Sequence, residues 1–169
     1  DPEDASKGRI HGAIAGWEVD NVMQQKVETY RVAGTFNYFT PGSEAALATA
    51  LVTAYDKREP WVGYNWSPTW MTGSYDLTLL EEPEYSEEAW EDGYASAFPP
   101  NRVTVAVNKD VQDHAPDVVD FLSQYETSSD LTAEALAYME DNDASADETA
   151  LWFMDEHEEL WTAWVPEEV

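Results

Sequence analysis

Hydrophobic and polar positions in the first part of the chain predict a strand, a turn and a helix. Residues 9–15 form a short apolar run that ends at Gly16, which indicates a buried strand followed by a turn. Over residues 19–30 the apolar side chains recur every three or four positions, as they do on one face of a helix. The opposite, polar face of this helix is expected to carry Glu18, Asp20, Gln24, Gln25 and Glu28.

The alternation of strand and helix patterns continues as far as residue 66. Residues 35–40 alternate as a second strand, and a helix follows over residues 43–55, with Ser43 in position to cap its first turn. Residues 61–66 are rich in aromatic side chains that suit a pleated surface, and Pro68 cannot continue a strand ladder, so a third strand is expected to end near residue 66. This order predicts an α/β fold with a doubly wound, mainly parallel sheet and flanking helices.

The rest of the chain carries one strand pattern and several helix patterns. An acidic stretch over residues 81–92 predicts a solvated loop with one helical turn, and residues 102–107 alternate as the clearest strand of the chain. Ser145 and Glu148 have the spacing of a capping box. Aromatic residues near the carboxyl end, including Trp161 and Trp164, predict a packing face. The expected helices cover residues 116–125, 131–140 and 146–164.

The charge of the chain narrows the choice of function. There are 35 Asp and Glu residues against 8 Lys and Arg, which gives a formal net charge of −27 over 169 residues. Nucleic acid is excluded as a partner, because its phosphates need cationic side chains. Disorder is also excluded, because disordered acidic chains are poor in aromatic residues and this one has 13% of them. We expect a protein from a high-salt environment, where the Debye length falls to about 3 Å and self-repulsion is screened.

Candidate catalytic and metal-binding residues are few. The chain has no Cys and only 3 His, and it lacks a nucleophile elbow, a phosphate loop and zinc-ligand spacing. His157 lies among acidic residues, but a solvated helix face explains that pattern without a cation. Residues 141–145 resemble the start of a calcium loop, yet Ala146 and Trp152 stand where that loop needs Gly and Glu. We therefore expect a protein that is not an enzyme and holds no metal or cofactor.

Trp17 and Trp66 differ from the other aromatic residues in where they are expected to lie. Each follows the predicted carboxyl end of a parallel strand, which is where open α/β sheets bind ligands. Trp17 also precedes a helix whose unpaired amides begin at Glu18 and Val19, and such amides bind anions. Indole faces attract quaternary ammonium groups by cation–π interaction. A ligand that carries a carboxylate and a methylated ammonium would suit this pair, and packing in the core is the alternative role for both indoles.

Five blocks of residues carry a resemblance to a known family. In order along the chain they are Gly16-Trp17, Gly42-Ser43-Glu44-Ala45-Ala46, Tyr55-Asp56-Lys57-Arg58-Glu59-Pro60, Trp66-Ser67-Pro68-Thr69-Trp70, and Tyr75-Asp76-Leu77 through Leu80-Glu81-Glu82-Pro83. Together they resemble the substrate-binding proteins of glycine betaine ABC importers. The similarity continues weakly through residues 108–110, Pro116 and the last helix, so it covers nearly the whole chain.

The resemblance implies a type II periplasmic-binding-protein fold, in which two α/β lobes close on a ligand held in an aromatic box. This chain would supply one ligand-binding lobe, over residues 1–101, and a crossover strand with C-terminal helices, over residues 102–169. The partner lobe would be absent from the chain. We therefore expect a type II lobe whose ligand site is completed from outside this sequence.

The resemblance also implies roles for individual residues. Trp17 and Trp66 would form two sides of the aromatic box, and the backbone amides of Glu18 and Val19 would receive the ligand carboxylate. The family commonly has a ring where Thr69 stands and a small residue where Glu18 stands, which leaves a choline-like ligand without a carboxylate as an alternative to glycine betaine. Further candidates for ligand contact are Ser43, Thr69 and Trp70.

The expected function is solute binding for an osmoprotectant importer, with glycine betaine or a related quaternary ammonium compound as ligand. The expected partners are the ABC permease and ATPase subunits and the missing second lobe. The chain has no apolar run near the ~18 residues of a membrane span and begins with neither Met nor a signal region, so it looks excised from a longer precursor. The resemblance implies an extracytoplasmic protein, periplasmic or at the cell surface, for example held by a lipid anchor or associated with the membrane. A carbohydrate-binding module or glycoside hydrolase domain is the alternative, because Trp platforms and carboxylates also suit sugars.

Overall fold

The structure, a computed structural model, describes residues 1–166, and the chain divides into two compact units. The first unit consists of residues 1–65 and 79–101, and the second of residues 66–78 and the chain from residue 102 onward. The segment that carries Trp66 therefore groups with the C-terminal helices rather than with the strands that precede it.

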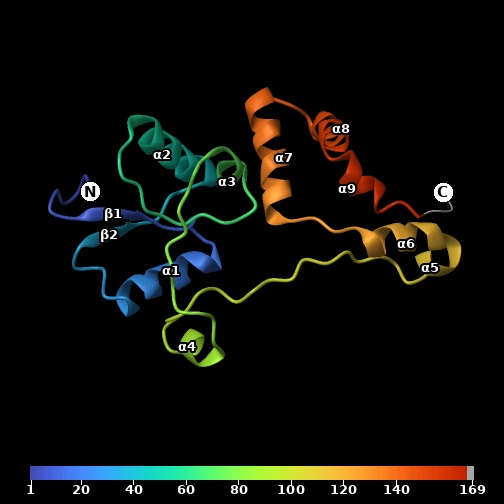
Figure 1. The fold of residues 1–169 in the computed structure, drawn as a ribbon. Coiled ribbons are helices and arrows are strands. Elements are labelled where there is room, and N and C mark those ends of the chain that lie inside the picture. Colours follow the sequence, from blue (N-terminus) through green and yellow to red (C-terminus); the bar gives the residue numbers. More distant parts are fainter. Residues whose placement is uncertain (167–169) are drawn as a thin grey trace. The chain divides into compact units, whose positions relative to one another are not determined.

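The first unit is built on two parallel strands and two long helices. Strands β1 (Gly8–His11) and β2 (Phe36–Phe39) pair in parallel, with Gly8 opposite Phe36. Helix α1 (Glu18–Thr29) connects them, and α2 (Glu44–Lys57) leads to Gly63, which forms a single parallel bridge with His11 on the other side of β1. Figure 1 shows α1 and α2 on opposite sides of the two strands. The strand β1 is therefore central, and its carboxyl end is flanked by both connections.

Local sequence signals set the bounds of α2 and bury its apolar side. The Ser43 hydroxyl accepts a hydrogen bond from the Ala46 amide at 3.2 Å, which caps the first turn as predicted. Arg58 ends the helix in the left-handed conformation, with φ of 56°. The buried apolar residues of the first unit come from α1, α2 and the loops after β1 and β2: Ala13, Ile14, Val22, Val27, Pro41, Leu47, Ala48 and Leu51.

The segment of residues 79–101 completes the first unit and contains α4 (Glu87–Glu91), a short helix capped by Ser86. This confirms the prediction of an acidic loop with one helical turn. The segment is bound to α1 at two places, by a hydrogen bond of 2.7 Å from the Thr29 hydroxyl to the Gly93 carbonyl and by the buried side chain of Lys26.

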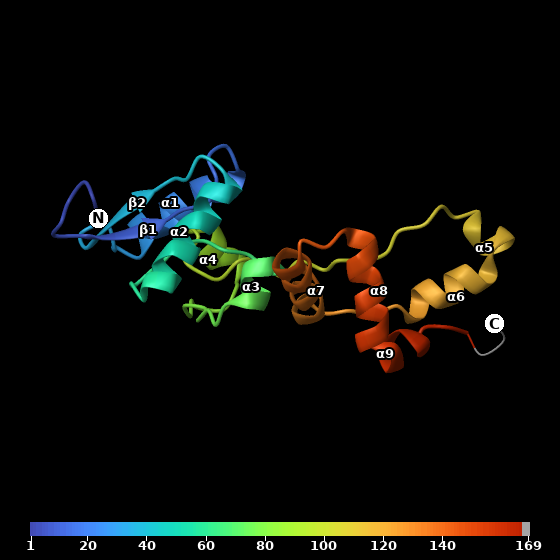
Figure 2. The same cartoon turned by 90° about the horizontal axis from the view of Figure 1, so that it is seen from above.

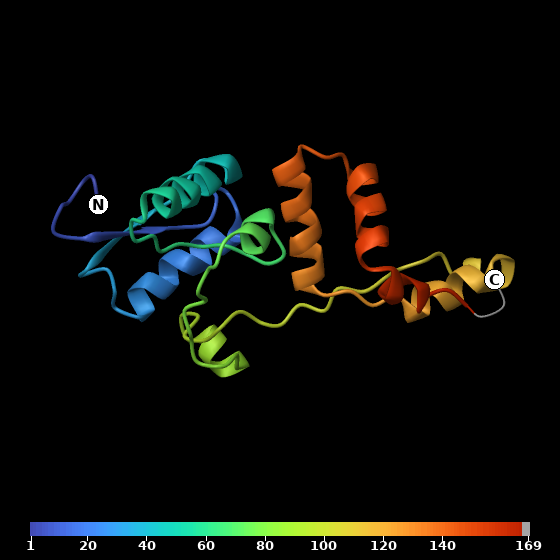
Figure 3. The same ribbon diagram turned by 45° about the horizontal axis from the view of Figure 1, so that its top comes forward.

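In the part that the structure describes, the regular elements of the second unit are all helices. Helix α3 (Trp70–Ser74) packs against α7 (Ser129–Asn142), as Figure 2 shows. Met71 of α3 and Ala133 of α7 are buried in this contact. Helix α8 (Ala146–Glu156) follows α7 after a left-handed Asp143, and the two helices lie side by side in Figure 3. The remaining helices are α5 (Val111–His114), α6 (Pro116–Gln124) and α9 (Glu158–Thr162).

Several details of the second unit confirm the sequence analysis. Ser145 and Glu148 form the predicted capping box at the start of α8. Trp164 is buried, and its ring meets the ring of Tyr125 edge-on, with the ring centroids 4.7 Å apart. Trp152 stacks on Tyr138 at a centroid distance of 4.2 Å. These indoles serve packing between helices, as their spacing predicts.

Four predicted elements are wrong in extent or type. The strand expected over residues 9–15 is β1, which ends at His11. Residues 61–66 form only the bridge at Gly63 instead of a strand. Residues 102–107 are not a strand either, because no strand among residues 1–166 pairs with them, and Val103 is 94% exposed. The single helix expected over residues 146–164 is two helices, because His157, with φ of −117° and ψ of 39°, interrupts it.

The mixed α/β content is confirmed, but the doubly wound sheet is not. The described part of the chain is rich in helix, and its sheet has two strands, fewer than the doubly wound sheet that the alternating patterns predict. The parallel pairing, the helical crossover and the helices on both sides of the strands agree with the prediction. The sheet has fewer strands than predicted, because among the described residues the segment 61–66 pairs with β1 only at Gly63 and the segment 102–107 pairs with no strand.

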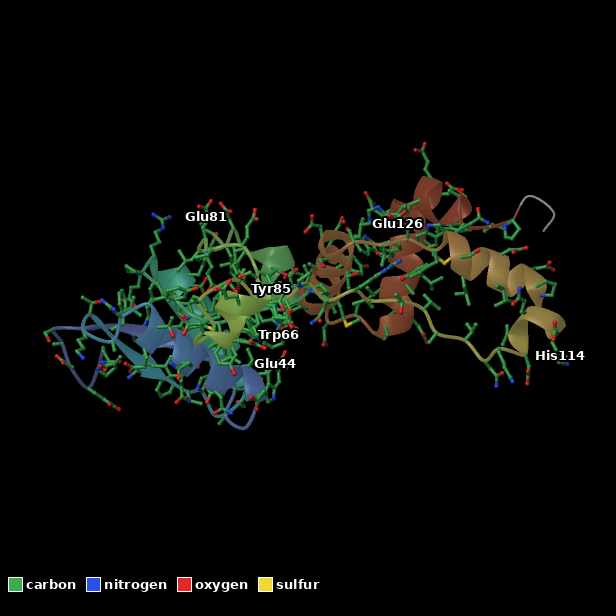
Figure 4. The ribbon with its side chains drawn as sticks, turned by 90° about the horizontal axis from the view of Figure 1, so that it is seen from below. Glu44, Trp66, Glu81, Tyr85, His114 and Glu126 are labelled. Carbon is green, nitrogen blue, oxygen red and sulfur yellow. The ribbon has the colours of Figure 1, made fainter. Side chains whose placement is uncertain are left out.

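Acidic side chains lie on the surface of both units, which leads to a prediction about salt. Glu44, Glu81 and Glu126 are exposed and are labelled in Figure 4. The charges of a chain with a net charge of −27 repel each other over about 10 Å in about 0.1 M salt and over about 3 Å in molar salt. The melting temperature is therefore expected to rise between about 0.1 M and about 2 M KCl. An unchanged melting temperature in calorimetry at the two concentrations would contradict the assignment to a high-salt environment.

Candidate functional site

Trp17 is held at the carboxyl end of β1 by a short, well-bonded turn. Ala13 and Ile14 continue from the strand and are buried, and Gly16 turns the chain with φ of 89°. The Trp17 amide donates to the Ile14 carbonyl at 3.0 Å, and Trp17 is the N-cap residue of α1. Its side chain keeps 41% of its surface exposed. The predicted position of this indole, between the end of a strand and the start of a helix, is confirmed.

The first turn of α1 provides backbone donors beside Trp17. The amides of Glu18 and Val19 begin the helix, and the first amides of a helix have no intrahelical acceptor. Trp17 makes no side-chain cap, so these donors lie at the positive end of the helix dipole. The same turn carries two carboxylates, Glu18 at the surface and Asp20 in the interior. The amides can receive an anion, and the Glu18 carboxylate opposes one by charge.

Ser43 lies on the neighbouring loop at the same edge of the sheet. The loop after β2 is joined to the loop after β1 by a hydrogen bond of 3.0 Å from the Ala15 amide to the Pro41 carbonyl. The Ser43 hydroxyl uses one of its lone pairs to cap α2 and keeps its proton for another acceptor. The structure thus brings four of the predicted residues to the carboxyl end of the parallel strands: Trp17, Glu18, Val19 and Ser43.

The other three predicted residues belong to the second unit and surround the start of α3. Thr69 is buried, caps α3 and forms a capping box with Thr72, so its hydroxyl has a structural role. Trp70 begins α3 and meets the ring of Tyr75 edge-on at a centroid distance of 6.0 Å. Trp66 precedes this helix and is half-buried. Thr69, Trp70 and Trp66 thus form a group in the second unit, and the four residues at the strand ends form a group in the first unit.

Helix α3, which follows Trp66 along the chain, approaches α7 closely at Gly73. A Cβ atom at Gly73 would lie 2.7 Å from the carbonyl carbon of Ala133 and 2.9 Å from the Cβ of Ala137. Neither neighbour can move without moving α7. Replacing Gly73 by Ala is therefore expected to lower the free energy of unfolding of the second unit by about 1–3 kcal/mol, because overpacking costs that much.

The Gly73→Ala variant can be measured by denaturant unfolding followed by tryptophan emission. Gly34 is the matched control, because a Cβ atom there would meet nothing within 4 Å and its φ is not positive. Gly34→Ala is expected to leave stability within about 0.5 kcal/mol of the wild type. Equal effects of the two substitutions would show that the contact of α3 with α7 is looser than the structure describes.

A buried network beside Trp17 was not predicted from the sequence. Asp20, which helical spacing assigns to the polar face of α1, is 7% exposed, and its carboxylate accepts hydrogen bonds from Tyr38 and Thr40 of the β2 region. Burial, together with the hydrogen bond to Asp20, raises the pKa of Tyr38 well above its usual value, so the phenol stays protonated. Asp20 can be buried, contrary to the prediction, because hydroxyl groups donate hydrogen bonds to its carboxylate.

His11, at the end of β1, has an apolar setting. Its ring stacks on Trp61 at a centroid distance of 5.6 Å and meets Phe39 edge-on at 5.9 Å. Burial, and to a smaller extent the charge of Arg9, lowers the pKa of His11. Among residues 1–166 there is no group of three or more His, Asp or Glu side chains that could hold a metal ion. His11 is therefore a neutral packing residue under the strand ends.

Comparison with known proteins identifies the family. The model of the "Substrate binding domain of ABC-type glycine betaine transport system" matches residues 1–156, and the chain belongs to this family. The glycine betaine-binding periplasmic protein OusX of Dickeya dadantii (strain 3937) is 24% identical over 122 residues, which are 65% of this chain and 36% of that protein. The family consists of binding domains rather than enzymes, which confirms the prediction of a non-enzymatic protein.

Two solved structures share the fold. Lactococcal OpuAC, crystallised in a closed form with glycine betaine, has a TM-score of 0.59 and 20% identity, and the match covers 94% of this chain and 57% of that one. The glycine/betaine/L-proline-binding protein ProX of Borrelia burgdorferi has a TM-score of 0.58 and 20% identity, with 99% and 59% covered. The chain therefore spans between about a third and three fifths of the length of these relatives.

The family also bears on where the protein is found. Substrate-binding proteins of this family are extracytoplasmic, and the relative from Dickeya dadantii is named as periplasmic. Across residues 1–166, none of the helices combines the length and the apolar character needed to cross a membrane.

Proposed function

We propose that this chain is one lobe of the substrate-binding protein of an ABC importer, with glycine betaine or a related quaternary ammonium compound as its ligand. The observation that carries the proposal is the position of Trp17, an exposed indole beside the free amides of a helix at the carboxyl end of parallel strands. An indole face attracts a methylated ammonium, and helix amides accept a carboxylate. Membership of the family supports this reading.

Two indoles and two amides have the leading roles in this proposal. Trp17 and Trp66 each supply an indole face for the ammonium group, and the amides of Glu18 and Val19 receive the carboxylate when the ligand has one. Ser43 and Trp70 are further contacts in the proposal. Thr69 acts by capping α3, and so it orients the residues around it rather than donating to the ligand.

The partner lobe, in this proposal, lies outside the chain. Residues 102–107 support it, since Val103, Val105 and Val107 are exposed on a segment that pairs with no strand in the described part of the chain. In the intact protein this segment would pair as a strand in the sheet of the second lobe. The intact protein would work outside the cytoplasmic membrane, in the periplasm or at the cell surface, with or without a lipid anchor, and would deliver its ligand to a permease driven by an ATPase.

The test is a titration of the intact protein, followed by tryptophan emission and calorimetry, with glycine betaine, choline and an oligosaccharide. We expect saturable binding of the quaternary ammonium compounds and none of the oligosaccharide. This chain alone should bind them weakly, because half of the proposed site is supplied from outside it. Binding of the oligosaccharide alone would overturn the proposal in favour of a carbohydrate-binding module. Tight binding of glycine betaine by the isolated chain would show that no second lobe is needed.

A further inference from the structure

One phenol group connects the chain on both sides of Trp17. The Tyr38 hydroxyl accepts a hydrogen bond from the Ala13 amide, at 3.2 Å, in the turn that precedes Trp17. The same hydroxyl donates to Oδ1 of Asp20, at 2.7 Å, in the helical turn that follows Trp17. Ala13 has no exposed surface and Asp20 is 7% exposed, so both bonds are shielded from water. The two ends of the Trp17 turn are thus held to a single atom of β2.

Neighbouring residues are arranged around this phenol. A Cβ atom at Gly12 would lie 2.6 Å from Cε1 of Tyr38, so the approach of the ring requires glycine at that position. The Thr40 hydroxyl, two residues further along the chain, donates to the same Oδ1 atom at 3.2 Å. Tyr38 and Thr40 thus attach α1 to the end of β2, whereas Gln24, which donates to Oδ2 of Asp20 at 3.0 Å, belongs to α1 itself.

We propose that Tyr38, Thr40 and Asp20 form a positioning clamp that fixes the Trp17 indole and the amides of Glu18 and Val19 for ligand binding. The clamp acts through geometry, because Trp17 lies along the chain between Ala13 and Asp20, the two residues that bond to the Tyr38 hydroxyl. None of the three clamp residues needs to touch the ligand. The role in ligand binding rests on the proposed function, whereas the effect on the Trp17 turn does not.

The clamp predicts different effects for two variants that each remove a donor to the Asp20 carboxylate. Tyr38→Phe removes the bond to Oδ1 of Asp20 and the bond from the Ala13 amide, which leaves Thr40 as the link from the end of β2 to Asp20. A lost bond to a charged group corresponds to about a tenfold rise in the Kd for glycine betaine in the intact protein. Gln24→Met removes a bond of similar length within the helix and is expected to change the Kd by less than about twofold. Equal changes in the two variants, at equal folded fraction, would overturn the clamp as a determinant of binding.

A second measurement does not depend on any ligand. Fluorine spectra of the intact protein labelled with 5-fluorotryptophan report on each indole, and the Trp17 signal is assigned by its loss in Trp17→Phe. We expect this signal to shift or broaden in Tyr38→Phe and to stay in place in Gln24→Met, while the signal of the packed Trp164 is unchanged in both. A Trp17 signal identical to that of the wild type in Tyr38→Phe would overturn the clamp.

A third pair of variants keeps the test decisive if Tyr38→Phe does not fold. Thr40→Val loses the hydroxyl that donates to Asp20, and Thr40→Ser keeps it. We expect the Trp17 signal to move in Thr40→Val and to return to its place in Thr40→Ser; movement in both variants, or in neither, contradicts the clamp. If the Trp17 signal follows this pattern while the wild type binds neither glycine betaine nor choline, the clamp stands and the proposed function fails.

Discussion

Replacing Lys26 by Met is expected to lower the free energy of unfolding by about 3 kcal/mol, a large part of the 5–15 kcal/mol of a typical domain. The Lys26 side chain is 4% exposed and donates to the Glu82 carboxylate and to the carbonyl of Ser96, a residue without exposed surface. Methionine fills the space of the alkyl chain but leaves the carboxylate and the carbonyl without this donor. Chemical unfolding followed by circular dichroism measures the loss.

Aromatic rings add to the cost of losing this ammonium group. The Lys26 Nζ atom lies 5.0 Å from the ring centroid of Phe98 and 5.7 Å from the centroids of Tyr30 and Trp90. Cation–π attraction contributes about 0.5–2 kcal/mol at such sites. All these partners except Tyr30 lie in the segment of residues 79–101, so Lys26 fastens that segment to α1.

Lys7 provides the matched control for this prediction. Its Nζ atom donates to one carbonyl, that of Ala33, at 2.9 Å, and Lys7→Met should cost no more than about 1 kcal/mol. In a double-mutant cycle, the variant with both Lys26→Met and Glu82→Gln should lose less free energy of unfolding than the sum of the two single variants, because no unpaired charge remains. A loss below about 1 kcal/mol in Lys26→Met would show that this buried group has little effect on stability.

The burial of Asp20 and Lys26 could not be predicted from the hydrophobic pattern of α1. The periodicity of α1 predicts its bounds within one residue and places Trp17 ahead of it, as the structure confirms. The same periodicity assigns Asp20 to solvent and says nothing of Lys26. Their partners are distant along the chain, since Glu82 is 56 residues from Lys26 and Ser96 is 70 residues away. Helical spacing describes one element, whereas burial of a charge depends on which segments fold against it.

Strand prediction failed for a related reason. The alternating residues 102–107 and the aromatic residues 61–66 have the composition of strands, but a strand exists only where a neighbour accepts its hydrogen bonds. Residues 36–39 have that neighbour in β1. Residues 61–66 pair with β1 only through the bridge at Gly63. The alternation shows which residues are able to form a strand and leaves the partner undetermined.

The cap of α3 was readable from the sequence and was assigned differently. Thr69 and Thr72 have the N-cap to N3 spacing, and Pro68 precedes them, so a helix start was visible at this point. The resemblance to the family instead places Thr69 among the candidate ligand contacts. In the structure it is buried and engaged with Thr72, which explains why a threonine is suited to this position.

Removing either Trp17 or Trp66 is expected to weaken binding of glycine betaine to the intact protein by up to about thirtyfold. Each indole contributes about 0.5–2 kcal/mol of cation–π attraction once the ligand is desolvated, and each decade in Kd corresponds to 1.4 kcal/mol. Trp17 is exposed at the edge of the first unit, and Trp66 is half-buried, so Trp17→Ala should leave the fold intact and Trp66→Ala should cost some stability. Calorimetric titration of each variant at 25 °C gives the Kd.

Trp164→Ala is the control that separates binding from packing. Trp164 is 8% exposed, and its ring meets those of Phe121 and Tyr125 edge-on, so its loss leaves a cavity of the kind that costs about 3–5 kcal/mol. We expect this variant to melt at a lower temperature and to bind glycine betaine with nearly unchanged affinity per folded molecule. If Trp17→Ala and Trp66→Ala instead remain folded and bind as the wild type does, the two indoles are not part of the ligand site, and the amides of Glu18 and Val19 lose the observation that makes them candidates.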